Sequence, residues 1–224
     1  MNLFSRLRAL KLPCAWVFVL AAALAVRPGV AAQSAPGDAA VIPYGGHHEF
    51  GAQVGYSPHG GPIWGFSQNV RYSPTVLRYS YLLLTHERWT LRYAPELTAL
   101  SVLHENGPPN DVNPHVPVTH YGAGFSPEGF QMVFRPREKV QPFLSNAAGV
   151  LYYNDRVLSP QGSQFMYTID FGAGVNLFTS RRNAVQMGFR YQHLSNANIS
   201  VHNPGTDAQT FYVGFSHFHT KGVR

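Results

Sequence analysis

The 224-residue sequence predicts an all-β protein, an eight-stranded antiparallel up-and-down β-barrel that spans a membrane. Segments in which apolar and polar residues alternate recur along the chain, separated by clusters of Gly, Pro and Asn. Aromatic residues are abundant, with 15 Phe, 12 Tyr and 3 Trp, whereas only 12% of the residues are charged. The predicted connections alternate between long and short, which is typical of outer-membrane barrels.

Residues 1–32 have the features of a secretory signal peptide. Three basic residues precede an apolar run at 12–26, and the small residues that follow suit cleavage after Ala32. The apolar run is short for a membrane-spanning helix, which needs about 20 residues. The alternative is an uncleaved anchor. No later segment has an apolar run long enough for a transmembrane helix.

Removing this segment changes the charge of the chain. It contains four basic residues and no acidic ones, so its loss lowers the formal net charge from +6 to +2. The excess of basic residues is therefore mainly a property of the leader and does not predict nucleic-acid binding. The single cysteine, Cys14, is also lost, which suits export through an oxidising periplasm. About 190 residues remain, the size of one domain.

The first half of the barrel is predicted from four alternating segments. After a flexible tail at 33–45, the barrel is expected over residues 46–220, with its first strands at 48–57, 75–84, 89–103 and 118–134. A Pro/Gly-rich loop extends from the first strand to about Pro74, and a polar loop with four prolines precedes the fourth. Arg92 and Glu96 share the inner face of the third strand and are expected to pair, because a lone buried charge is costly. The break at 126–129 is interpreted as a bulge or short turn.

The second half of the barrel follows the same pattern. Strands are predicted at 140–153, 164–178, 184–195 and 209–219, joined by a longer loop at 154–162, a tight turn at 179–183 and a loop at 196–208. Each predicted strand has one polar and one apolar face. The polar face suits a narrow, filled lumen, and the apolar face suits contact with acyl chains. A soluble barrel would invert this arrangement. Alternation alone does not distinguish the two, and the export signal and the aromatic content favour the membrane barrel.

The candidate chemistry lies at the end of the seventh predicted strand. His193 and Ser195 share a face with Phe189 and Tyr191, because side chains alternate along a strand. This strand runs from a tight turn towards a long loop, so the pair is expected at the extracellular end, facing lipid near the outer-leaflet headgroups. Considered alone, a His-x-Ser at a strand end is more often a polar rim than a nucleophile.

These residues could nevertheless form a serine-hydrolase site. His193 is placed to act as general base on Ser195, and Asp207, just before the adjacent eighth strand, is the best-placed acid to orient the imidazole. The Asn196 side chain carries an amide that can donate to an oxyanion. The other histidines are interpreted as polar surface. No spacing of His, Cys or acidic residues suggests a metal site, and no cofactor is predicted.

The segment 189–197 resembles the signature of the lipid A 3-O-deacylase (PagL) family of eight-stranded outer-membrane barrels. The segments Asn203-Pro204-Gly205, 93–98, 140–143 and 171–175 extend the likeness over most of the mature chain. The resemblance implies a serine esterase on the outer barrel face that removes the ester-linked 3-hydroxyacyl chain at position 3 of lipid A. It assigns His193 as base, Ser195 as nucleophile and Asn196 as oxyanion donor.

The sequence departs from the family pattern at two site positions. Asp207 stands where the family has a glutamate and is one methylene shorter. Asn198, the second candidate for the oxyanion site, stands where the family has a glycine that supplies a backbone donor.

The expected partners are lipopolysaccharide and the outer membrane, with the site facing the outer leaflet. A homodimer is compatible with the sequence. The alternatives are a non-catalytic structural or adhesive barrel and an outer-membrane phospholipase or acyltransferase.

Overall fold

The computed structural model describes residues 43–61, 63–67, 69–106 and 117–219. The predicted signal peptide and most of the predicted tail lie outside these ranges, as does much of the proline-containing loop. The described end of the tail is held by the barrel: the Tyr44 ring packs on Phe178 with centroids 5.6 Å apart, and the Gly45 N–H donates to Arg181 O at 2.9 Å. In the described residues, no helix has the length and apolar character needed to cross a membrane.

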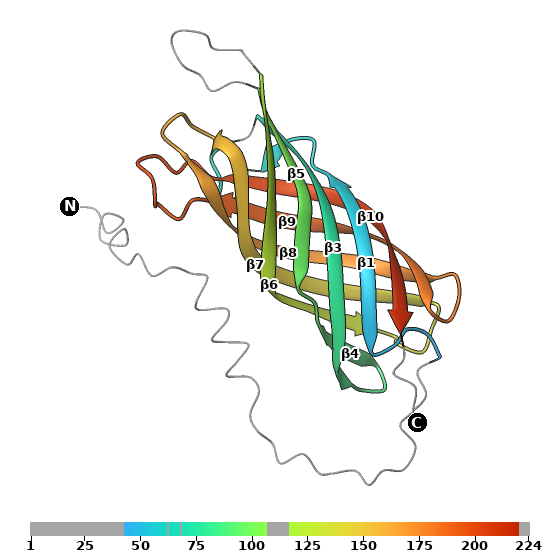
Figure 1. Cartoon of the computed structure of the whole chain (residues 1–224). Coiled ribbons are helices and arrows are strands. Elements are labelled where there is room, and N and C mark those ends of the chain that lie inside the picture. The colour runs from blue at the N-terminus through green and yellow to red at the C-terminus, as the bar shows by residue number, and fades with distance from the viewer. Residues whose placement is uncertain (1–42, 62, 68, 107–116, 220–224) are drawn as a thin grey trace, which may run out of the picture. The chain divides into compact units, whose positions relative to one another are not determined.

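The described strands form one antiparallel sheet that closes on itself (Figure 1). They are β1 (His48–Tyr56), β2 (Gly60–Gly61), β3 (Val70–Thr85), β4 (Trp89–Tyr93), β5 (Glu96–Glu105), β6 (Val118–Phe134), β7 (Val140–Val157), β8 (Ser163–Phe178), β9 (Asn183–Ser195) and β10 (Thr206–His219). The ring closes because β1 pairs with both β3 and β10. Since β4 and β5 are halves of one barrel strand and β2 is a short addition to β10, the ring has eight strands, which confirms the predicted fold class.

The observed boundaries differ from the predicted ones where pairing with a neighbour prolongs a strand. β3 begins at Val70 and β10 at Thr206, so Asp207 lies within β10 and not before it. β7 continues to Val157, which makes the β7–β8 connection shorter than predicted. The predicted bulge at 126–129 is present as a register shift between Phe125 and Glu128. The break between β4 and β5 was not predicted; Pro95 lies there and has no N–H to donate.

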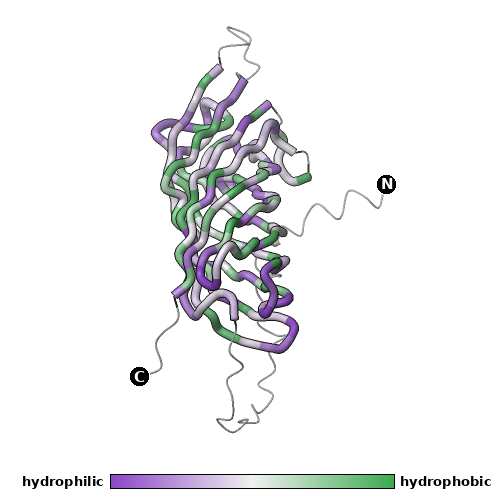
Figure 2. Tube along the Cα trace, turned by 90° about the vertical axis from the view of Figure 1, so that its right-hand side faces the viewer, coloured by the Kyte–Doolittle hydropathy of each residue, from purple (hydrophilic) through white to green (hydrophobic). Residues whose placement is uncertain are grey.

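Hydrophilic and hydrophobic residues alternate along the strands (Figure 2), and the burial of alternate residues places them on opposite faces of the barrel wall. Large apolar side chains are exposed on the outer face, among them Phe50, Leu77, Phe171, Phe211 and Val213. Charged and amide side chains are buried inside, among them Glu49, Gln53, Arg78, Gln186 and Arg190. The polar row therefore faces the lumen and the apolar row faces outward, as predicted for a membrane barrel.

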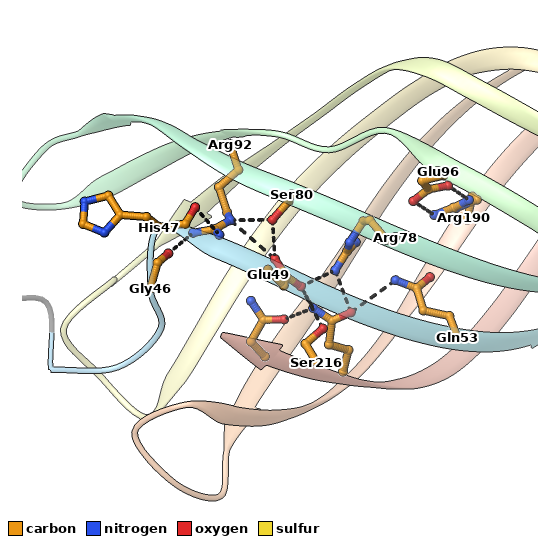
Figure 3. Close-up of polar contacts among 12 residues, drawn as sticks. Gly46, His47, Glu49, Gln53, Arg78, Ser80, Arg92, Glu96, Arg190 and Ser216 are labelled. Carbon is orange, nitrogen blue, oxygen red and sulfur yellow. Dashed lines mark hydrogen bonds and ion pairs between the residues drawn. The ribbon is translucent and has the colours of Figure 1, made fainter. Parts of the chain in front are cut away.

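Ion pairs lie inside the lumen, but the pair predicted from the third strand is not among them (Figure 3). Arg92 Nε lies 3.4 Å from Glu49 Oε2, and Glu96 accepts two hydrogen bonds from Arg190 at 2.6 and 2.8 Å. The expected Arg92–Glu96 pair is wrong because four residues of strand separate them by about 13 Å. Arg92 instead reaches β1, two strands away, where Arg78 also joins Glu49 at 2.9 Å, whereas Glu96 reaches β9 on the opposite side of the ring.

Apolar layers lie in the same interior. One layer, next to the long connections, contains Tyr72, Leu103, Tyr153, Met166 and Leu194. Another contains Phe178, Ala184 and Phe218. β9 contributes Arg190 and Leu194 to this interior, so its inward side chains fix the strand and hold its outward side chains in position.

Candidate active site

The C-terminal end of β9 presents Tyr191, His193 and Ser195 on the outer face of the barrel. Their inward neighbours Gln192 and Leu194 are buried, which fixes the alternation of this strand. β9 starts at a short turn and ends at the connection 196–205, so the site lies at the barrel end that carries the longer connections. This is the end predicted from the sequence.

His193 and Asp207 are in direct contact. Their Cα atoms are partners in the β9–β10 ladder, and His193 Nδ1 lies 2.6 Å from Asp207 Oδ1. The Asp207 side chain is fully buried, whereas 19% of the His193 side chain is exposed. Because side chains directly opposite each other in an antiparallel pair start close together, the short aspartate side chain reaches the imidazole. The contact at Nδ1 leaves Nε2 as the second ring nitrogen.

Ser195 is the last residue of β9 and pairs with Tyr167 of β8. It lies on the same face as His193, two residues along the strand, which corresponds to about 7 Å of strand rise. In the described part of the chain, no hydrogen bond joins the Ser195 hydroxyl to His193. The structure therefore brings the His193 imidazole and the Asp207 carboxylate together, with Ser195 two residues further along the same face of β9.

The candidate oxyanion residues are bonded within the connection that follows Ser195. Asn196 Nδ2 donates to Ser200 Oγ at 2.5 Å and to His202 O at 2.9 Å, while its backbone N–H donates to Asn203 Oδ1 at 3.0 Å. The Asn198 N–H donates to Asn196 Oδ1 at 2.9 Å. In this arrangement both residues shape the turn, and the Asn196 amide and the Asn198 backbone N–H are engaged by acceptors of the connection itself.

The turn itself shows which backbone conformation Asn198 adopts. Ile199 N–H donates to Asn196 O at 3.0 Å, and the two central residues have positive φ, 51° at Ala197 and 62° at Asn198. Both central residues have positive φ in a type I′ turn, a conformation that Gly and Asn adopt more readily than other residues. Asn198 therefore suits the conformation of this turn, and Ala197 is the residue under strain.

Two residues of the site were not found from the sequence. Trp64 and Gly65, in the connection between β2 and β3, donate their backbone N–H groups to Asp207 Oδ2 at 2.7 and 2.9 Å. The Trp64 ring meets the rings of His193 and Tyr191 edge-on, at centroid distances of 5.8 and 5.6 Å. This segment has no periodic pattern, and the only signal was a tryptophan in a Gly/Pro-rich loop.

The groups on this face suit acyl transfer from an ester. A buried carboxylate contacts an imidazole, and a serine lies two residues further along the same face of the same strand. Across the described residues, no group of three or more His, Cys, Asp or Glu side chains could hold a metal ion.

Comparisons with known proteins agree with this fold. The family model for lipid A 3-O-deacylase (PagL) matches residues 75–216. The solved structure of the outer membrane enzyme PagL is similar, with 16% identity and a TM-score of 0.53, over 74% of this chain and 97% of that one. Neisserial surface protein A (NspA) is similar with 13% identity and a TM-score of 0.50, over 77% of this chain and 97% of that one. No curated protein matches the chain.

Proposed function

The chain belongs to the lipid A 3-O-deacylase (PagL) family, and we propose that it is a serine esterase that hydrolyses the ester-linked 3-hydroxyacyl chain at position 3 of lipid A. The observation that carries this proposal is the 2.6 Å contact between His193 Nδ1 and Asp207 Oδ1, on the outer face and beside Ser195. A serine hydrolase needs these three roles in one place.

In the proposed reaction, Ser195 Oγ attacks the ester carbonyl and His193 Nε2 takes its proton. The tetrahedral intermediate collapses, the sugar oxygen leaves with the proton from His193, and the acyl group stays on Ser195. Water then attacks the acyl-enzyme, and its proton passes through His193 back to Ser195. Asp207 remains ionised, holds the ring through Nδ1 and stabilises the imidazolium.

Asn196 and Asn198 are proposed to stabilise the oxyanion. An amide nitrogen carries two hydrogens, and those of Asn196 Nδ2 are engaged by Ser200 and His202. The proposal therefore requires Asn196 to exchange one of these acceptors for the oxyanion. This exchange needs only a local change, because the Ser200 hydroxyl keeps a second hydrogen bond, to His202 O at 3.2 Å, when Asn196 Nδ2 leaves it.

We propose that the barrel lies in the bacterial outer membrane, with the site facing the outer leaflet. The exposed apolar side chains of Tyr167 and Phe171 lie on β8, next to β9, where acyl chains would lie against the wall. A lipid substrate would then reach Ser195 from the side, without entering the filled lumen.

A non-catalytic barrel is the second candidate. The missing hydrogen bond between Ser195 and His193 and the engaged Asn196 amide favour it. A scaffold of this kind would use the connection 196–205 only as a surface.

Mass spectra of lipid A from cells that express the protein separate the candidates. Loss of one 3-hydroxyacyl chain with the wild type, but not with Ser195→Ala, is the expected result. A gain of an acyl chain would indicate an acyltransferase, and lysophospholipid with unchanged lipid A would indicate a phospholipase. An unchanged lipid composition would indicate the non-catalytic barrel.

A further inference from the structure

We infer that the segment 64–67 is a positioning element for the His193–Asp207 pair, holding the carboxylate by its backbone and the imidazole by the Trp64 ring. This inference rests on the proposed function for its catalytic consequence. It differs from that function in assigning a role to a connection that contributes no reacting group.

The segment is fixed to the start of β10 independently of Asp207. Phe66 N–H donates to Pro204 O at 2.9 Å and Ser67 N–H donates to Gly205 O at 3.1 Å. The Thr206 hydroxyl donates to Ser67 O at 2.7 Å. These three bonds align residues 66–67 with residues 204–206. The N–H groups of Trp64 and Gly65, which precede them, then meet the side chain of Asp207.

The carboxylate of Asp207 is thereby held at both oxygens. Oδ1 contacts His193 Nδ1 at 2.6 Å, and Oδ2 accepts from the backbone of Trp64 at 2.7 Å and of Gly65 at 2.9 Å. Hydrogen bonds to an ionised acceptor are shorter and stronger than neutral ones. Two donors on Oδ2 prevent rotation about the Cβ–Cγ bond, so Oδ1 stays directed at the imidazole.

The Trp64 ring restrains the other partner. Its plane is nearly perpendicular to the His193 ring, at 86°, and to the Tyr191 ring, at 78°. Edge-to-face contacts of this kind favour one ring orientation. Trp64 itself is 51% exposed, so its ring forms the border between the imidazole and the surroundings.

Gly65 is the position at which this arrangement can be tested. A Cβ added there would lie 2.5 Å from Thr206 Cα and 2.7 Å from Thr206 C. Both are backbone atoms, so an alanine would force the segment away from β10. The Gly65 and Trp64 N–H groups would then leave Asp207 Oδ2.

The experiment compares Gly65→Ala with Phe66→Ala in the full chain, refolded in detergent micelles. Phe66 lies in the same segment, but its side chain is 83% exposed and only its backbone N–H is used. The first readout is the far-downfield proton resonance expected for an imidazole Nδ1–H bonded to a carboxylate. The second is kcat and KM for hydrolysis of lipid A.

We expect Gly65→Ala to lose the downfield resonance and to lower kcat by about 100-fold with KM unchanged, as for a small misplacement of a catalytic group. Phe66→Ala should keep both. A Gly65→Ala protein that retains the resonance and kcat would overturn the inference. If Gly65→Ala does not fold, as judged by heat-modifiable migration, Trp64→Ala and Trp64→Phe replace it. Loss of kcat in Trp64→Ala with recovery in Trp64→Phe supports the inference, and equal kcat in both overturns it.

The resonance also separates this inference from the proposed function. If the wild type does not hydrolyse lipid A, the proposed function fails, and the resonance in the same variants still decides whether segment 64–67 positions the pair.

Discussion

Asp207 lies directly opposite His193 in the β9–β10 ladder, and its two carboxylate oxygens have different partners. Oδ1 meets the imidazole and Oδ2 meets the backbone of the β2–β3 connection. An aspartate side chain is thus long enough for this site, because its two oxygens already make both sets of contacts.

We therefore predict that Asp207→Glu lowers esterase activity, although glutamate is the family residue. The extra methylene would push the carboxylate against the segment that donates to Oδ2. Asp207→Ala should lower kcat more strongly, by about 100- to 10,000-fold, because the imidazole loses its orientation and its counter-charge. The measurement is kcat/KM on purified lipid A in detergent. Activity of Asp207→Glu equal to or above the wild type would show that the acid is not matched to its partners.

Asn196→Ala should lower kcat by about 100- to 1,000-fold if its amide turns to the oxyanion. Ser200→Ala is the matched variant, because it removes one acceptor of Nδ2 and leaves the amide in place. We expect Ser200→Ala to keep or raise kcat. Parallel losses in both variants would mean that Asn196 acts only through the shape of the turn.

Ala197→Gly should stabilise the barrel by about 0.5–1 kcal/mol, because a left-handed alanine is strained and a glycine is not. Asn198→Ala should act in the opposite direction, since it places a second alanine at positive φ. Urea unfolding in detergent gives both values. Destabilisation by Ala197→Gly would contradict the turn described for residues 196–199.

Glu96→Ala should destabilise the barrel by about 3–5 kcal/mol, because it leaves the buried Arg190 charge without its bidentate partner. Replacing both residues together, as Glu96→Leu with Arg190→Met, should recover part of this loss. The recovery is incomplete because Arg190 also lies 3.7 Å from Asp170 Oδ1, and that buried carboxylate loses its cation. The free energies of unfolding of the two single variants and the double variant test the pair. Equal loss in the double variant and in the sum of the single variants would show that the two side chains are not coupled.

The fold could be predicted because alternation with period two is a local property of each segment. The strand ends could not, since Val157 and Thr206 continue their strands through pairing with neighbours that the sequence does not specify. The ion-pair partners inside the lumen could not be predicted from the sequence either. Arg92 and Glu96 share one barrel strand and one face, yet Arg92 pairs with Glu49 on β1, two strands away, and Glu96 pairs with Arg190 on β9, on the opposite side of the ring.

The part of the site that lies on paired strands could be predicted, and the part that depends on loops could not. The contact between His193 and Asp207 follows from two adjacent antiparallel strands and matching parity. The roles of Trp64 and Gly65 do not, because they depend on how a loop without periodicity lies on β10. The bonds of the Asn196 amide within its own turn are likewise a tertiary detail, and they redirect a donor that the sequence assigned to the substrate.

The most direct test of the central claim is mass spectrometry of purified hexa-acylated lipid A incubated with the refolded protein. We predict loss of the ester-linked 3-hydroxyacyl chain from position 3 and release of one free 3-hydroxy fatty acid, with neither change in Ser195→Ala. Unaltered lipid A with the folded wild type, or the same product with Ser195→Ala, would contradict it.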